Sequence, residues 1–116
     1  MGYLHFCSIA VMLIYYSPLS NVAYSNLDEW YSASDKERRE FIAKHFAEEI
    51  VRSDRNTPYD YAMCTGRMFA KQLTRDEVKD YPLANTKPQY LTRDRRIEIM
   101  SNLPREILQN CAKYIQ

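Results

Sequence analysis

The chain has 116 residues, a length that suits one domain, and its 16 basic and 15 acidic residues give a formal charge of +1. A balance this close to neutral argues against a polybasic nucleic-acid-binding protein and against an acidic tail. The charges are placed unevenly, because every Asp, Glu, Lys and Arg lies between Asp28 and Lys113. The sequence therefore divides into an uncharged leader and a heavily charged body.

The uncharged leader has the pattern of a signal peptide. Its apolar run, from Leu4 to Tyr16, is shorter than the roughly 20 residues that cross a bilayer as a helix. It has the length of a signal-peptide core, and Ala23-Tyr24-Ser25 places small residues where cleavage requires them. The leader lacks the usual Lys or Arg, so a buried first element of a cytosolic fold and an uncleaved membrane tether are the alternatives. We predict a cleavable signal peptide over residues 1–25 and a single helical domain over residues 26–116.

The three cysteines support the same division of the chain. Cys7 lies in the leader and is removed with it, which leaves Cys64 and Cys111 as an even pair. A body this small buries a modest core, so one cross-link contributes much of its stability. We predict a disulfide between Cys64 and Cys111. The alternative is two free thiols packed as small apolar side chains in a cytosolic core.

The first helix predicted in the body starts at a capping box formed by Ser34 and Glu37 and runs to about residue 52. Its apolar side chains recur at helical spacing: Ile42, Phe46 and Ile50. A polar stretch ends this helix. Thr57-Pro58 then predicts a second helix, with Thr57 as the N-cap and Pro58 as the first helical residue.

The second helix extends to about Leu73 and places Tyr61 and Cys64 on one face with Met68. A glycine inside a helix costs about 1 kcal/mol relative to alanine. Gly66 therefore either permits a close helix contact or loosens this helix. A capping box of Thr74 and Glu77 predicts a short third helix that ends before residue 81.

Residues 81–91 contain two prolines and no periodicity, so we predict an extended loop. Thr92 caps the next helix, which runs through Met100. Pro104 is unfavourable inside a helix, so it is predicted to start a separate last helix, which carries Cys111 on its apolar stripe. No segment alternates as a strand does. The predicted fold is all-α: a small bundle of four to five short helices with one inter-helix disulfide.

The sequence carries no signature of catalysis or of cofactor binding. His45 and Glu49 have the spacing of two metal ligands on a helix, but a site needs three or four ligands and the body has no other histidine. Gly2 and Gly66 are too few for a phosphate-binding loop, and no nucleophile elbow is present. We predict a protein that is not an enzyme and that binds no metal, no small-molecule cofactor and no nucleic acid. A small hydrolase whose site is unreadable from sequence is the enzymatic alternative.

Two groups of side chains are candidates for a partner-binding surface. Tyr81 and Tyr90 lie on the predicted loop, and tyrosine is enriched at binding surfaces. The alternative is that both rings fill the core, with their hydroxyl groups at its rim. Arg93 and Arg96 lie at the start of the following helix and form either a patch for an acidic partner or a salt-bridged surface, since acidic residues are interleaved with them.

These features favour a small exported protein, periplasmic or secreted, that binds, assists or inhibits another envelope or secreted protein without being an enzyme. It would touch a membrane only through its leader before cleavage. In size and in its single long-range disulfide the body resembles the HdeA-like periplasmic acid-stress chaperones, which implies a stress chaperone as the alternative function. The resemblance is one of layout: those chains place a cysteine beside a tryptophan, whereas Trp30 and Cys64 are far apart here, so no site residue is transferred.

Overall fold

The computed structural model describes residues 27–83 and 90–116. In these two ranges the chain forms five α-helices, two short 3-10 helices and no strand. The elements in order are α2 (Leu27–Ser32), α3 (Asp35–Ser53), α4 (Tyr59–Gln72), α5 (Arg75–Lys79), η1 (Tyr81–Leu83), α6 (Arg93–Cys111) and η2 (Ala112–Tyr114). The predicted all-α bundle with an inter-helix disulfide is confirmed. The predicted signal peptide, the domain boundary at residue 26 and residues 84–89 of the predicted loop lie outside the described residues.

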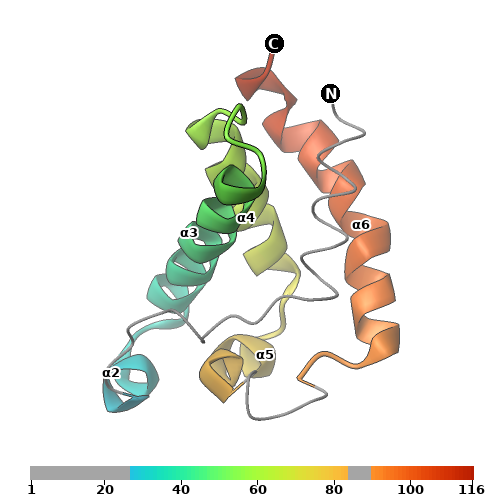
Figure 1. Ribbon diagram of the computed structural model, residues 1–116. Helices are drawn as coiled ribbons and strands as arrows, with labels where there is room; N and C mark the ends of the chain where they lie inside the picture. The colour runs from blue at the N-terminus through green and yellow to red at the C-terminus, as the bar shows by residue number, and fades with distance from the viewer. Residues whose placement is uncertain (1–26, 84–89) are drawn as a thin grey trace.

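Helix α4 lies between the two other long helices. Figure 1 shows α3 on one side of it and α6 on the other, with α2 and α5 gathered at one end. A short turn joins α3 to α4, so these two helices run antiparallel. Arg95 near the start of α6 contacts the end of α4, whereas Cys111 at the end of α6 is bonded to Cys64. The helix α6 therefore also runs antiparallel to α4.

The helices α3 and α4 approach each other closely at Gly66. A Cβ atom added to Gly66 would lie 2.2 Å from the carbonyl oxygen of Ala43, closer than van der Waals contact allows. Glycine has no Cβ, so it lets the two backbones meet here. Beside this contact Phe46 and Phe69 stack with their ring centroids 4.4 Å apart. Of the two interpretations of Gly66, the close helix contact is confirmed.

Hydrogen bonds between nearby residues form at the predicted starts of α3 and α5. The Oγ atom of Ser34 accepts a hydrogen bond from the N–H of Glu37, and the Glu37 carboxylate accepts one from the N–H of Ser34. Thr74 and Glu77 form the same reciprocal pair at the start of α5. Both predicted capping boxes are thus confirmed. Helix α4 starts one residue later than predicted, because Pro58 is its N-cap rather than its first helical residue.

A single helix, α6, replaces the two helices predicted for the last part of the chain. The predicted break is wrong, since Pro104 lies inside α6. A proline in a helix interior costs about 3 kcal/mol. One continuous helix keeps four buried side chains on a single stripe: Ile99, Leu103, Ile107 and Cys111. Burying each large aliphatic side chain contributes about 1.5–3 kcal/mol, so this stripe more than offsets the cost of the proline.

The helix α2 was not predicted, and contacts with distant residues stabilise it. Trp30 is fully buried, and its indole N–H donates a hydrogen bond to the carbonyl of Lys79 at 3.0 Å. The guanidinium of Arg38 donates to the carbonyl groups of Trp30 and Tyr31 at 2.9 and 2.8 Å. These bonds satisfy acceptors that a helix C-terminus leaves without partners. Because the partners lie on α3 and α5, the local sequence of α2 gives no sign of them.

Arginines from two other helices hold the C-terminal end of α4. Arg39 on α3 donates to the carbonyl groups of Ala70 and Leu73 at 2.6 and 2.9 Å. Arg95 on α6 donates to the carbonyl of Gln72. A positive charge at a helix C-terminus is favoured by the helix dipole as well as by these bonds. The three long helices are therefore fastened together at this end by arginines and nearer the chain terminus by the disulfide.

Candidate functional site

The structure contains the disulfide that the sequence predicted, between Cys64 and Cys111. Cys64 on α4 and Cys111 at the end of α6 are joined, with their Cα atoms 5.7 Å apart and 47 positions apart in sequence. The Cα separation lies in the usual range for disulfides. Cys111 is fully buried and Cys64 almost so. The alternative of two free thiols is therefore not the state that the structure contains.

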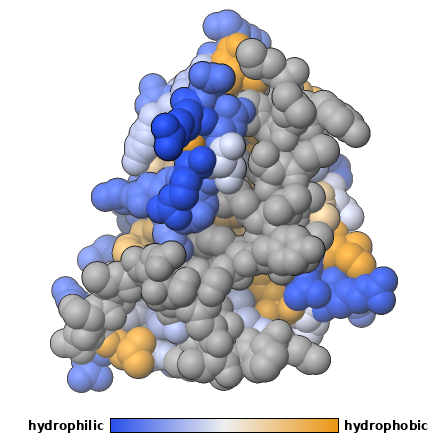
Figure 2. Space-filling model, viewed as in Figure 1, coloured by the Kyte–Doolittle hydropathy of each residue, from blue (hydrophilic) through white to orange (hydrophobic). Residues whose placement is uncertain are grey.

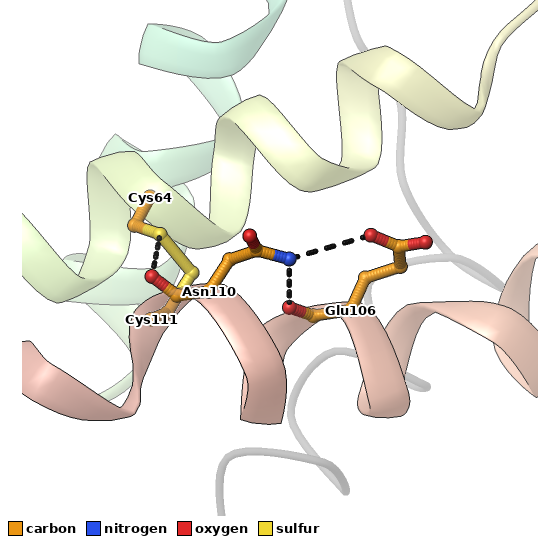
Figure 3. Close-up of a disulfide and its surroundings, with 4 residues drawn as sticks. All are labelled: Cys64, Glu106, Asn110 and Cys111. Carbon is orange, nitrogen blue, oxygen red and sulfur yellow. Dashed lines mark hydrogen bonds between the residues drawn. A yellow bond between two sulfur atoms is a disulfide. The ribbon is translucent and has the colours of Figure 1, made fainter.

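The disulfide lies between α4 and the end of α6, beside Asn110 (Figure 3). The carbonyl oxygen of Asn110 lies 3.4 Å from Sγ of Cys64. A sulfur atom in a disulfide has no hydrogen to donate, so this is a close contact rather than a hydrogen bond. The side-chain amide of Asn110 donates to the carbonyl of Glu106 at 2.9 Å. The bridge thus lies against the backbone of α6, between two cysteines that are both buried.

Tyr81, one of the two tyrosines predicted to bind a partner, belongs to the core. Its side chain is fully buried, and it lies in η1 directly after α5. Its ring stacks on Trp30 with centroids 6.1 Å apart, and its hydroxyl oxygen lies 3.4 Å from Nδ1 of His45. Of the two interpretations of Tyr81, the structure therefore supports the core. A partner-binding role would need exposed surface that this side chain does not have.

Tyr90 is half-buried at the edge of the same aromatic cluster. Its ring meets that of Tyr81 edge to face, with centroids 6.1 Å apart. Its hydroxyl group donates a hydrogen bond to the carbonyl of Glu77. Tyr90 is thus a rim residue whose polar end is already bonded to the protein. Its predicted contact with a partner stays a prediction, since the adjoining residues 84–89 are outside the described ranges.

The two arginines that were predicted to bind a partner, Arg93 and Arg96, differ in exposure. Arg93 is exposed, whereas Arg96 is half-buried and donates to the carbonyl of Leu91 at 3.3 Å. Between them, Arg95 forms an ion pair with Glu77 at 2.8 Å and another with Glu98 at 2.7 Å. Burial raises the pKa of Glu77, but hydrogen bonding from Arg95 and Thr74 outweighs burial and leaves this pKa below its usual value. The interleaved charges thus include structural ion pairs, and binding of an acidic partner by Arg93 and Arg96 stays a prediction.

Two exposed tyrosines lie elsewhere, near the end of the chain. Tyr59 in the first turn of α4 is 48% exposed and Tyr114 in η2 is 40% exposed. Ile115 follows Tyr114 and is also exposed. We call these three residues together with Arg67, which is exposed on α4, the C-terminal patch. Figure 2 shows hydrophobic atoms among hydrophilic ones at the end of the molecule where Figure 1 marks the C-terminus.

Within the C-terminal patch, the two tyrosines lie close enough to Arg67 to affect its pKa. The pKa of Arg67 is raised chiefly by its hydrogen bond to Glu40, with smaller contributions from the nearby phenol groups of Tyr114 and Tyr59. The Arg67–Glu40 pair, 2.7 Å long, links α4 to α3 and leaves both side chains about half exposed. The charged end of Arg67 therefore lies near two exposed tyrosines. Sequence reasoning missed this grouping, although Tyr59 lies off the buried stripe that Tyr61 defines.

A groove of about 420 Å³ runs beside this pair, between the start of α3 and the end of α4. Four basic and two acidic side chains line it together with one alanine: Asp35, Lys36, Arg39, Glu40, Arg67, Ala70 and Lys71. Two of the basic groups are paired with the acidic ones, Arg39 with Asp35 and Arg67 with Glu40. The groove therefore has a weak positive charge.

His45, weighed as a metal ligand, lies under the aromatic cluster. Burial lowers its pKa, and the negative charges of Glu49 and Glu48 partly oppose that effect. Its ring packs near Phe41, with centroids 6.5 Å apart. Among the described residues no group of three His, Cys, Asp or Glu side chains could hold a metal ion. The arrangement around His45 is that of a core histidine.

No helix in residues 27–83 or 90–116 is both long enough and apolar enough to cross a membrane. No protein-family model matches the chain, and no curated protein or solved structure matches it.

Proposed function

We propose that this protein is a small exported binding protein, without enzymatic activity, that contacts another envelope or secreted protein through the C-terminal patch. The observation that carries the proposal is the exposure of Tyr59 and Tyr114 near the cationic Arg67. Tyrosine and arginine are the residue types, with tryptophan, that most often dominate the energy of protein interfaces. Ile115 adds exposed apolar area beside them.

The disulfide gives this patch a rigid support. Cys111 precedes η2 directly, so its bond to Cys64 fixes the segment that carries Tyr114 against α4, which carries Tyr59. Binding is stronger when the contact side chains lose little conformational freedom. Tyrosine has few rotatable bonds for its area, so two tyrosines on a cross-linked frame present a largely preorganised surface.

Export is supported by the same disulfide. Disulfides form and persist in oxidising compartments, such as the periplasm and the extracellular space, and are rare in the cytosol. The uncharged leader with its Ala23-Tyr24-Ser25 cleavage pattern points to the same route. The proposed location is therefore the periplasm or the cell exterior.

The mass of the intact protein tests the export proposal. A protein isolated from the envelope or the culture medium should begin at or close to Asn26, because cleavage after Ser25 removes the leader. The measurement is intact mass spectrometry before and after reduction, which also reports the disulfide. A cytosolic protein that retains Met1 to Ser25 would contradict the proposed export and location.

Binding of a partner is tested by affinity capture from envelope extract, followed by measurement of affinity for the captured protein. We expect one partner in stoichiometric amount. Tyr59→Ala and Tyr114→Ala should each weaken its binding about tenfold, which corresponds to about 1.4 kcal/mol. Tyr31→Ala is the matched control, since Tyr31 is an exposed tyrosine on the distant helix α2. Capture of many unrelated proteins at low pH would instead favour the chaperone alternative, and unchanged affinity in both variants would exclude the C-terminal patch.

A further inference from the structure

The outer side of α6 has an apolar surface separate from the C-terminal patch. Ile97 is 50% exposed and Leu108 is 66% exposed, and they lie about three helical turns apart on one side of the helix. Ser101 and Pro104 occupy the turns between them. We call these four residues the α6 stripe. The buried residues of α6, such as Leu103, lie on a different side that faces α4.

The α6 stripe is suited to close contact with another helix. Its two large apolar side chains stand at the ends, and two shorter side chains between them allow a second helix to approach. The hydroxyl group of Ser101 already donates to the carbonyl of Ile97 at 2.8 Å. Removing water from this surface therefore leaves no hydroxyl donor without a partner.

We propose that the α6 stripe is the interface of a homodimer in which two copies of α6 pack antiparallel. A twofold axis between Ser101 and Pro104 places Ile97 of each copy against Leu108 of the other. In such an isologous contact the same surface meets itself, so its features must match after the chain direction is reversed. The positions of the two large side chains satisfy this requirement, since each lies about as far from the axis as the other.

The charges beside the α6 stripe match in the same register. Glu98 and Arg105 are about two helical turns apart and therefore lie on one flank of the stripe. In the antiparallel pair this flank meets the same flank of the second copy, which brings Glu98 of each copy opposite Arg105 of the other. Glu98 is 62% exposed even though it pairs with Arg95. Arg105 is exposed and has no ion-pair partner among the described residues.

Charge complementarity and symmetry favour a second copy over an unrelated protein as the occupant. A single register forms both contacts between Ile97 and Leu108 and both ion pairs between Glu98 and Arg105 of the two copies. A single helix face buries an area at the low end of the range for protein interfaces, and interfaces under about 1,200 Å² are typical of weak complexes. We therefore expect a dimer with a dissociation constant in the micromolar range.

Sedimentation velocity of the disulfide-bonded protein over a series of concentrations tests the dimer. The wild-type protein should shift from monomer to dimer as its concentration rises. Leu108→Glu should stay monomeric at every concentration, because it places a charge in the contact. Tyr59→Glu is the control: it changes an exposed apolar residue of the C-terminal patch and should leave dimer formation unchanged. A wild-type protein that is monomeric throughout, or a Leu108→Glu variant that dimerises normally, would overturn the proposal.

A charge exchange tests the antiparallel register itself. Arg105→Glu places like charges opposite one another and should weaken the dimer at least tenfold. Glu98→Arg combined with Arg105→Glu restores opposite charges and should recover most of the affinity. Thermal melting of each variant confirms that it remains folded. If the double variant is no better than Arg105→Glu at equal stability, the proposed register is wrong. The outcome of this test does not affect the partner-capture experiment, because that experiment concerns the C-terminal patch and not the α6 stripe.

Discussion

The carbonyl oxygen of Ala43 leaves no room for a side chain at position 66. In an isolated helix, Gly66→Ala would stabilise by about 1 kcal/mol through helix propensity. In this bundle the added Cβ meets backbone rather than a flexible side chain, so α3 and α4 must separate. We expect a net loss of about 2 kcal/mol in the free energy of unfolding, measured by urea denaturation. Lys71→Ala, an exposed change on the same helix, should have little effect. A more stable Gly66→Ala protein would contradict the close contact.

For Tyr81 the loop sequence left both a core and a partner-binding role open, and its burial favours the core. Its full burial against Trp30 predicts that Tyr81→Ala lowers stability by about 3 kcal/mol or more, as for other large aromatic side chains in cores. Tyr59→Ala, which changes an exposed tyrosine, should alter stability by at most about 0.5 kcal/mol. Thermal melting of the two variants distinguishes the roles. Equal melting temperatures for both would mean that Tyr81 does not support the core.

At the scale of elements, the disulfide holds the end of α6 against α4. The chain-entropy model assigns a stabilisation of about 4 kcal/mol to a cross-link that spans 47 positions. This is large beside the roughly 5–15 kcal/mol that stabilises a typical domain. Reduction should therefore lower the melting temperature by on the order of 20 °C.

Calorimetry with and without reductant measures this effect. Cys64→Ala combined with Cys111→Ala is the control, because reductant should not lower its melting temperature further. Thiol titration in denaturant provides the second measurement. Free thiols at both Cys64 and Cys111 in the purified, non-reduced protein would contradict the bridge and weaken the argument for export.

The helices differ in how far their own sequences define them. The starts of α3 and α5 were predicted because a capping box is a bond between residues three apart, as for Ser34 and Glu37. The continuity of α6 was not, because Pro104 disfavours a helix locally while burial on both sides of it favours one. The helix α2 was missed for a related reason, since Arg38 and Lys79 stabilise it from other elements.

At the scale of the whole molecule, we expect stability to depend on pH through His45. Burial lowers its pKa in the folded protein, Arg52 adds slightly to that effect, and Glu49 and Glu48 oppose it. The unfolded chain therefore takes up a proton first as the pH falls, so stability should decrease as the pH falls below about 6.5. The hydroxyl of Tyr81, 3.4 Å from Nδ1, is the group facing it from η1.

Urea denaturation at about pH 7.5 and about pH 5.5 measures this dependence. His45→Gln should remove most of the difference between the two conditions, because glutamine does not titrate. The carboxylates of Glu40 and Glu77 also have lowered pKa values, the first chiefly through its hydrogen bond to Arg67. Their contribution is lost only as the pH falls below about 4.5, outside this window. A pH dependence that persists in His45→Gln would assign the effect to another group.

The sequence by itself determined the features that depend on neighbouring positions or on simple pairing. These are the helical fold class, the two capping boxes, the burial of Tyr61 and Cys64 on α4 and the pairing of Cys64 with Cys111. Tertiary structure decided which aromatic side chains are exposed, with Tyr81 inside and Tyr59 outside. It also decided that α6 is continuous and that α2 exists. These outcomes depend on contacts between residues far apart in the chain, whose burial outweighs local preference and which no local pattern records.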